Sequence, residues 1–317
     1  FTRVRVHRGR LSWPFLSNRF DLAFIITQCR KIAERDIFQA VAGRADFLVD
    51  LEAALELFRE KGFAETSMRE VANRAKVAEL SGGRIGYIHI QGMDQASLDR
   101  FERDLYAAAH GRDALLVDVR NNGGGRVGNS TSFSRYISKR PFKVADSLYS
   151  IRRHSKYGKH IQHNWAIQAL MPFLTKKRKD GLYHFGYFER HRFSPKKKNH
   201  FDGRTYILTS GYSFSATTLF INAVKGQPGV TVIGEETGGG AYGNSAWEIP
   251  TVVLPNTRIR LKLPLFRMVM DKNGPNNGRG IFPDVEVGAT PESIRLNYDN
   301  KMRVTQSLIR AARRKGS

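Results

Sequence analysis

Residues 206–220 read YILTSGYSFSATTLF, and they combine a strand, a sharp turn and the start of a helix. The turn ends at Ser215, so the serine hydroxyl lies at a predicted helix N-terminus. Free N–H groups and positive partial charge at such an end favour a developing anion. Serine is also a preferred helix N-cap, so Ser215 by itself fits either a nucleophile or a cap.

A second strand-to-helix turn lies upstream, where residues 115–125 read LLVDVRNNGGG. An apolar strand ends here in polar residues and three consecutive glycines. Consecutive glycines let backbone N–H groups approach a ligand oxygen, which suits a phosphate cradle or an oxyanion hole, and they also suit an ordinary tight turn. The chain has no GxxxxGK[ST] motif and no GxGxxG that opens a helix, which disfavours a nucleotide site.

Outward from these two turns, the chain alternates strands and helices, which predicts an α/β fold. The order is strand 84–90, helix 95–109, strand 114–119, helix 127–137, strand 206–209, helix 215–225 and strand 230–234. Further strands at 249–254, 258–263 and 266–270, followed by a helix at 302–314, predict that the sheet is mixed.

The region before residue 80 has a different pattern. Leu51, Ala54, Leu55 and Phe58 recur at helical spacing, and Gly62 ends that run before Ser67 caps the next one. We therefore expect a small helical region over residues 1–80 and a core domain over residues 81–317.

Composition places the chain among ordinary globular proteins. It has 317 residues, 41% hydrophobic, which is enough to bury a sizeable core. Its one cysteine, Cys29, excludes an internal disulfide framework, a cysteine zinc site and an iron–sulfur cluster. No histidine spacing of the zinc-binding type occurs and no apolar run reaches about 18 residues, so we expect no metal, no cofactor and no transmembrane segment.

Positive charge is concentrated in one segment of the core domain. Residues 135–204 carry 18 lysines and arginines but 4 acidic residues, so +14 of the net +23 lies in this basic insertion. Aromatic residues are interleaved with the cations, a pattern that suits single-stranded nucleic acid. The favoured interpretation is a solvated insertion whose aromatic side chains pack locally, because charge runs usually face water.

Five motifs in order resemble the tail-specific, or C-terminal processing, serine peptidase family, and most of all its tricorn-core branch. They are GGRIGYIHIQGM (82–93), LLVDVRNNGGG (115–125), TSGYSFSATTLFINAVK (209–225), VTVIGEETGGG (230–240) and GRGIFPDVEV (278–287). The resemblance covers residues 82 to about 290. It implies a ClpP/crotonase-like core with flanking helices and a peptidase that cleaves unfolded or tail-exposed proteins through an acyl-enzyme.

The resemblance also implies roles for particular residues. Ser215 matches the nucleophile, and the Ala216 N–H and Gly124 match the oxyanion hole. We also predict that four glycines bind substrate: Gly123 and Gly125 in the turn of residues 121–125, and Gly239 and Gly240 in the turn after the strand 230–234.

The position of the general base departs from the family pattern. Many members use a lysine where this chain has Gly240, and tricorn-type members use an upstream histidine with a glutamate where this chain has Asn277. Only His7 precedes the core motifs, and His89 matches a histidine without catalytic duty. The general base is therefore unidentified, and a catalytically impaired protein that binds peptide or apolar ligand is the alternative hypothesis.

Residues 53–78 are similar to the first two helices of TetR-type helix-turn-helix repressors. The similarity is incomplete, because Lys76 replaces the usual turn glycine and a predicted strand stands where a recognition helix would follow. Nucleic-acid binding, through these helices and the basic insertion, is therefore the third and least favoured hypothesis. The expected partner is a protein or peptide substrate, and the positive charge of the insertion favours an acidic one. The resemblance to the peptidases implies an exported or periplasmic bacterial protein, and the oligomeric state is not predicted.

Overall fold

The structure is a computed structural model that describes residues 84–109, 112–155, 157–162, 164–245 and 247–314. Its centre is a five-stranded sheet in the order β1-β2-β6-β7-β12. These strands are Ile85–His89, Ala114–Asp118, Arg204–Thr209, Val230–Gly234 and Val285–Glu286. All four pairings are parallel, so the carboxyl ends of the strands meet at one edge of the sheet. The turns after β2 and β6 therefore lie beside each other.

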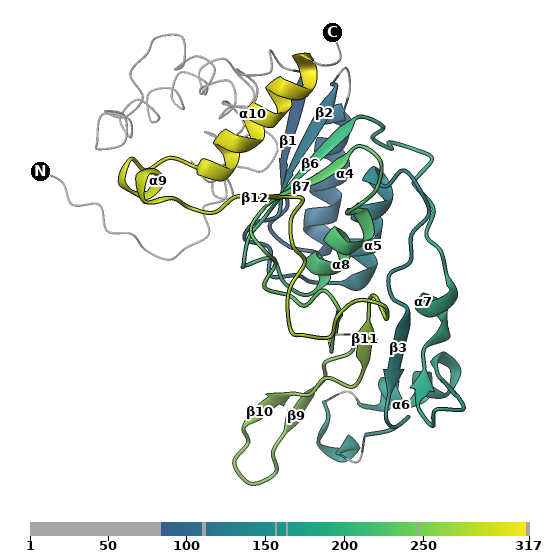
Figure 1. Cartoon of the computed structure of the whole chain (residues 1–317). Coiled ribbons are helices and arrows are strands. Elements are labelled where there is room, and N and C mark those ends of the chain that lie inside the picture. The colour runs from purple at the N-terminus through teal and green to yellow at the C-terminus, as the bar shows by residue number, and fades with distance from the viewer. Residues whose placement is uncertain (1–83, 110–111, 156, 163, 246, 315–317) are drawn as a thin grey trace, which may run out of the picture.

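Helices cover both faces of this sheet (Figure 1). Three helices share one apolar cluster with the sheet: α4 (Gln95–Ala109), α5 (Val127–Ile137) and α8 (Ala216–Val224). Helix α10 (Asn300–Arg314) contributes to a separate cluster on the other face. The alternation along β2 explains the division, because Leu115 and Val117 belong to the first cluster and Leu116 to the second.

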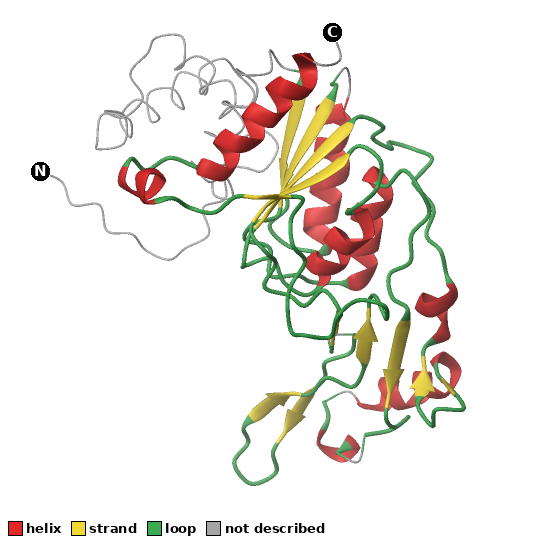
Figure 2. Ribbon diagram, viewed as in Figure 1, coloured by secondary structure: helices red, strands yellow, loops and turns green. Residues whose placement is uncertain are grey.

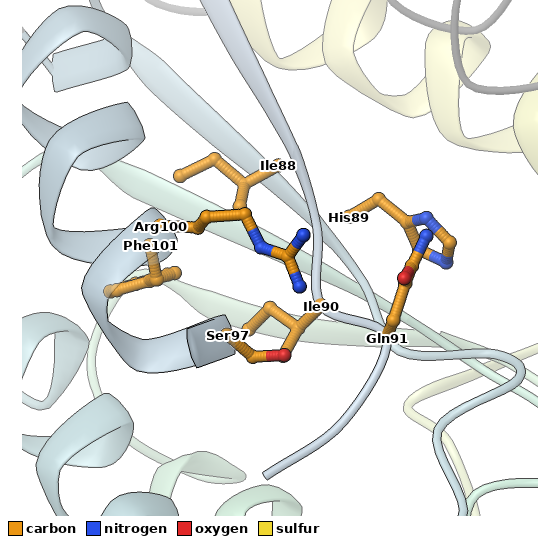
Figure 3. A pocket seen from close by; sticks show the side chains of 7 residues that line it. All are labelled: Ile88, His89, Ile90, Gln91, Ser97, Arg100 and Phe101. Atoms are coloured by element: carbon orange, nitrogen blue, oxygen red, sulfur yellow. The ribbon is translucent and has the colours of Figure 1, made fainter. Parts of the chain in front are cut away.

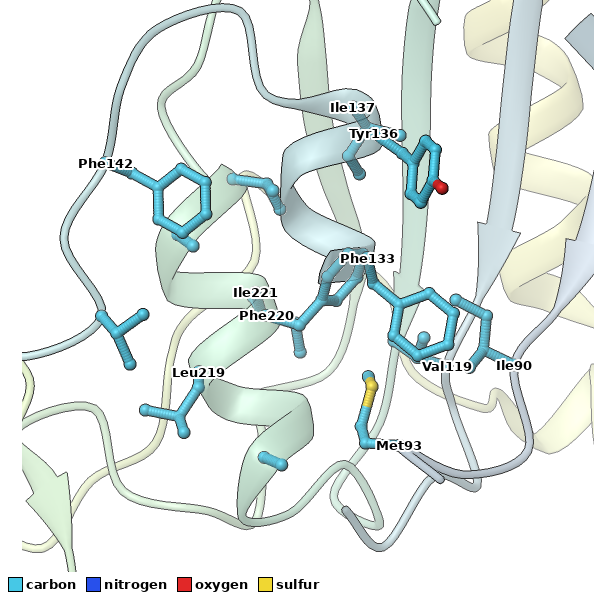
Figure 4. Close-up of a cluster of buried hydrophobic side chains, with 14 of the residues drawn as sticks. Ile90, Met93, Val119, Phe133, Tyr136, Ile137, Phe142, Leu219, Phe220 and Ile221 are labelled. Carbon is cyan, nitrogen blue, oxygen red and sulfur yellow. The ribbon is translucent and has the colours of Figure 1, made fainter. Parts of the chain in front are cut away.

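The larger cluster contains aromatic rings from all three helices, and Figure 4 shows Phe133 and Tyr136 of α5 and Phe220 of α8. The Phe133 ring lies edge-on to Phe101 of α4 with 5.0 Å between ring centroids, and its centroid lies 6.5 Å from that of Phe220. All three side chains are almost completely buried. Burying each of them stabilises the fold by about 1.5–3 kcal/mol, so this cluster fixes α5 and α8 against each other and against the sheet.

The remaining strands form antiparallel sheets beyond the carboxyl edge (Figure 2). One has the order β4-β5-β3-β11-β8, made of Lys176–Lys177, Tyr183–His184, Ser147–Ser150, Arg267–Val269 and Gly243–Asn244. The other pairs β10 (Arg260–Lys262) with β9 (Thr251–Val253). Short helices complete the described chain: η3 (Gly158–His160), α6 (Asn164–Leu174), α7 (Gly186–Arg190) and α9 (Pro291–Arg295). Every helix of the described residues is too short or too polar to cross a membrane.

The predicted α/β class, with parallel and antiparallel pairing, is confirmed. One detail differs from the expectation of a single mixed sheet. The strands predicted at 249–254, 258–263 and 266–270 appear as β9, β10 and β11, but they pair outside the main sheet. The predicted helices over 48–77 and the domain boundary near residue 80 lie outside the described residues and stay predictions.

The aromatic residues of the basic insertion largely pack on one another. Phe185 and Phe188 are buried and contact the ring of Trp247, with Phe188 4.6 Å from it between centroids. Phe193 stacks on Phe142 at 5.9 Å. This is the local packing that the favoured interpretation predicted, although α6 is an exception because Trp165 and Phe173 face solvent.

Candidate active site

Ser215 lies between β6 and α8 in a strained backbone conformation. Its φ is 54° and its ψ is −121°. Residues other than glycine occupy this region at a cost of about 1–3 kcal/mol, and such strain clusters at functional sites. Ser215 takes the N-cap position of α8, yet its side chain makes no capping hydrogen bond. Helix capping therefore does not explain why a serine occupies this position. The Ser215 hydroxyl is half-buried and caps no N–H group of α8.

The turn that carries Ser215 is tied to the end of β2. The Ser213 hydroxyl donates to the Val119 carbonyl at 2.9 Å, and the Ser210 hydroxyl donates to the carbonyl of Arg120. The Phe214 N–H donates to the Asn122 carbonyl at 3.1 Å. These bonds hold the two glycine- and serine-rich turns of the sequence in contact, as their neighbouring parallel strands require.

The side chain of Asn122 joins three segments at this contact. Its amide donates to the Ile90 carbonyl at 2.9 Å. Its Oδ1 accepts hydrogen bonds from the Gly124 N–H at 2.9 Å and from the Thr217 hydroxyl at 2.7 Å. The residue has no solvent exposure, so each bond forms in a low-dielectric interior where losing a partner is costly. Asn122 was not predicted as a site residue, because an asparagine in a glycine-rich turn is common and the sequence does not show what its amide meets.

Gly124 contacts the Ser215 turn so closely that no side chain fits. A Cβ atom at Gly124 would lie 2.7 Å from Ser215 Cβ and 3.0 Å from the Ala216 nitrogen, and its φ is +107°. Gly239, in the turn that follows β7, lies close to the same segment. A Cβ atom built on Gly239 would lie 3.0 Å from the Ser215 nitrogen. The structure thus brings together the backbones of Ser215, Ala216, Gly124 and Gly239, whereas their catalytic and binding roles stay predictions.

The other three glycines predicted to bind substrate have different surroundings. Gly123 is exposed and nothing lies within 4 Å of a Cβ built on it. Gly125 instead lies against the backbone of Met93, with which it forms an isolated bridge. Gly240 forms a bridge with Gly280. Gly123 is therefore the open position of the first glycine-rich turn.

Two backbone N–H groups are candidates to bind a negative oxygen beside Ser215. The Ala216 N–H begins α8, and no described residue accepts a hydrogen bond from it. The positive end of the helix dipole adds to its effect. The Gly124 N–H, the second donor implied by the resemblance, is directed at Asn122 Oδ1. In the described structure the neighbouring Gly123 N–H makes no hydrogen bond and is the available amide of that turn.

A buried ion pair lies at the end of β2, directly before the glycine-rich turn of residues 121–125. Arg120 donates to Asp118 at 2.6 Å and to Asp299, at the start of α10, also at 2.6 Å. The Tyr87 hydroxyl donates to Asp118 at 3.0 Å. Burial alone would raise the pKa of Asp118, but the Arg120 guanidinium holds that pKa below its ordinary value. Asp118 is thus a charged anchor for the strand end.

No described histidine, lysine or carboxylate forms a hydrogen bond with the Ser215 hydroxyl. Asn277, at the position where tricorn-type members carry glutamate, is exposed and accepts a bond from the Arg279 N–H at 3.1 Å. Glu236 is held by Arg279 at 2.6 Å, and these hydrogen bonds lower the pKa of Glu236. His89 lies on β1 opposite Asp118 in the sheet register. His7 lies outside the described residues, so the general base stays unassigned.

A small pocket opens at the carboxyl end of β1, where it meets the first turns of α4 (Figure 3). Its lining residues are Ile88, His89, Ile90, Gln91, Ser97, Arg100 and Phe101. The pocket shares the carboxyl edge of the sheet with the Ser215 turn but includes none of its residues. This pocket is therefore separate from the site of the candidate nucleophile.

A family model described as Peptidase family S41 matches residues 84–287, which is more than half of the chain. The chain belongs to peptidase family S41. The predicted resemblance is therefore confirmed. A second, short match covers residues 51–81, described as bacterial regulatory proteins of the tetR family, and it lies outside the residues that the structure describes.

Tricorn proteases are among the relatives of this S41 chain. It is 27% identical over 233 residues to the tricorn protease of Thermoplasma volcanium, which covers 73% of this chain and 18% of that protein. It is 46% identical over 54 residues to tricorn protease homolog 1 of Streptomyces coelicolor, covering 17% of this chain and 5% of that protein. The chain thus spans about a fifth or less of the length of these two relatives.

Among solved structures, mature CPAF complexed with lactacystin has the same fold. The TM-score is 0.54 at 15% sequence identity, and the similarity covers 71% of this chain and 51% of that chain. At this identity the similarity concerns the fold alone. This fold similarity agrees with the family match over residues 84–287.

Proposed function

We propose that this S41 chain is a serine-type endopeptidase that cleaves unfolded or tail-exposed proteins through an acyl-enzyme on Ser215. The observation that carries the proposal is the strained Ser215 backbone at the start of α8, with no capping bond to its hydroxyl. A strained serine between a strand and a helix presents its Oγ at the edge of the sheet. The family membership and the tricorn relatives support the same reaction.

In this mechanism the Ser215 oxygen forms a bond to the carbonyl carbon of the scissile peptide, and the carbonyl oxygen becomes negative. The Ala216 N–H and the Gly123 N–H, or Gly124 after a small rotation of the turn, donate to that oxygen. Collapse of the intermediate breaks the carbon–nitrogen bond and leaves an acyl-serine, which water then hydrolyses. The hydroxyl proton passes through a general base to the departing amine. Each oxyanion donor contributes about 100–1000-fold in rate.

The basic insertion supports a preference for acidic substrates. Its net charge of +14 raises the local concentration of negatively charged chains and speeds their association. This charge bears on the substrate class and not on the cleavage site.

A second candidate function is peptide or ligand binding on the same scaffold without turnover. The specific observation in its favour is the chemistry at the two family base positions. Gly240 has no side chain, and the Asn277 amide cannot act as a base. The two candidates share the fold and the surface around Ser215, and they differ in whether Ser215 is ever deprotonated.

Digestion of casein, followed by mass spectrometry, separates the two candidates. We expect the protein to release peptides from casein, and we expect the Ser215→Ala variant to release none. Circular dichroism of both proteins controls for folding. Casein left intact by both folded proteins would contradict the peptidase and support the binding function, which is then tested by measuring the affinity of the protein for peptides.

A further inference from the structure

Helix α6 lies beside the antiparallel strands, on the side of the molecule away from the main sheet (Figure 1). It exposes an apolar face. Trp165 is 77% exposed and Phe173 is 88% exposed. Leu170 and Leu174 are also exposed, whereas Met171 on the other side of the helix is buried. The sequence of this helix, NWAIQALMPFL, contains no charged residue. Exposed apolar faces of this kind mark interaction sites.

The segments around α6 carry positive charge almost exclusively. Residues 147–182 contain eight lysines and arginines and one acidic residue, Asp180. That carboxylate already binds the His184 ring at 2.8 Å. Lys176, Lys177 and Lys179 follow the helix directly, and all three are exposed. A partner of this surface must therefore be both apolar and negatively charged.

The β9–β10 hairpin extends the same kind of surface. The Gln162 N–H donates to the Thr251 carbonyl at 3.0 Å, so the segment before α6 is joined to β9. Ile259 and Leu261 are exposed on the hairpin, and the residues between and beside them are Arg258, Arg260 and Lys262. Residues 249–263 contain no acidic residue. We call α6, residues 176–179 and this hairpin the basic apolar tip.

We propose that the basic apolar tip binds the surface of an anionic lipid bilayer. Tryptophan and phenylalanine beside lysines are the side chains that insert at the headgroup boundary while the cations contact negative headgroups. The exposure of these side chains favours a bilayer over an acidic polypeptide. Trp165 and Phe173 protrude from the helix with 77% and 88% of their surface exposed, as insertion at a headgroup boundary requires.

Sedimentation with lipid vesicles tests this proposal on the full chain. One set of vesicles contains phosphatidylcholine alone, and the other contains 30% phosphatidylglycerol. We expect binding to the anionic vesicles, weakened by salt, together with a blue shift of tryptophan fluorescence. The paired substitutions Trp165→Ser and Phe173→Ser should weaken binding at least about tenfold, because they remove the inserting side chains. Ile294→Ser on α9, 72% exposed, is the matched control and should bind like the unmodified protein.

A second pair of variants separates the tip from the overall charge of the protein. Lys176→Gln with Lys179→Gln should weaken binding to anionic vesicles by about 10–30-fold. Lys197→Gln with Lys198→Gln removes the same charge elsewhere in the basic insertion and should have a much smaller effect. Equal effects of the two pairs, or no binding to anionic vesicles, would overturn the proposal. Self-association of the protein through Trp165 and Phe173 would also overturn it. So would binding to polyglutamate in the absence of a tryptophan fluorescence shift on vesicles.

Discussion

At the scale of single residues, the backbone of Ser215 determines the first expectation. Its φ of 54° and ψ of −121° are strained for serine and relaxed for glycine. Ser215→Gly should therefore raise the free energy of unfolding by about 1 kcal/mol, measured by urea denaturation. Ser215→Ala keeps the strain and should leave stability nearly unchanged. A Ser215→Gly variant less stable than the alanine variant would show that the serine backbone is not strained.

Gly124 gives a second prediction with a matched control at a nearby glycine. Gly124→Ala would place a methyl group 2.7 Å from Ser215 Cβ and 2.9 Å from the Phe214 carbonyl oxygen. We expect the variant to lose at least about 2 kcal/mol of stability and most of its casein cleavage. Gly128→Ala, on the exposed first turn of α5, meets nothing within 4 Å and should keep both. Equal behaviour of the two variants would contradict the packing of the glycine turn against Ser215.

At the scale of elements, Asn122 connects the end of β1, the glycine turn and α8. Asn122→Ala removes the acceptor of the Gly124 N–H and of the Thr217 hydroxyl, as well as the donor to Ile90. We expect kcat to fall about 100-fold with little change in KM, because the oxyanion donors shift while the substrate surface remains.

The adjacent Asn121 is exposed and serves as the control, since Asn121→Ala should leave kcat unchanged. A merely structural role of Asn122 would lower the amount of folded protein without changing kcat per folded molecule. Restored activity in Asn122→Asp, which keeps the acceptor oxygen, would support positioning. An Asn122→Ala variant with normal kcat would remove Asn122 from the site.

The elements of the core were predictable because their periodicity is strong. The predicted helix 95–109 coincides with α4, and the predicted 127–137 with α5. The predicted strand 230–234 coincides with β7. Pairing was less predictable, since a strand such as β9 carries the same pattern whichever neighbour it meets. Its partner is β10, the next strand along the chain, with which it pairs antiparallel.

The sequence motifs predicted which residues belong to the candidate site, but not which of their atoms are in contact. Ser215, Ala216 and Gly124 were assigned from the resemblance, and the structure brings their backbones together. The function of Asn122 and the engagement of the Gly124 N–H depend on which atoms meet across two turns. Spacing along the chain carries no information on those contacts, which arise from the pairing of β2 with β6.

At the scale of the whole molecule, the ion pair of Asp118 with Arg120 and Asp299 ties the central sheet to α10. Asp118→Asn should lower the free energy of unfolding at neutral pH by about 3 kcal/mol, because it leaves the buried Arg120 with one partner. The pKa of Asp118 is lowered in the folded state, so its contribution is complete above the ordinary value of 3.8 and is lost as pH falls below it.

Urea denaturation of both proteins between pH 7 and pH 3 checks this dependence. The difference between the unmodified protein and Asp118→Asn should be constant above about pH 5 and should narrow towards pH 3. Asp113→Asn is the control, because Asp113 pairs with Arg84 on the surface, where the pair contributes little. A difference that grows as the pH falls would contradict the charged state of Asp118.

The mass of the acyl-enzyme shows which residue is the nucleophile. The protein is incubated with an activated peptide ester, quenched in acid and digested, and the peptide that contains Ser215 is examined by mass spectrometry. We predict an added acyl mass on Ser215 and none on the corresponding peptide of Ser215→Ala. An acyl group on another residue, or casein cleavage that continues undiminished in the alanine variant, would contradict the assignment of Ser215 as the nucleophile.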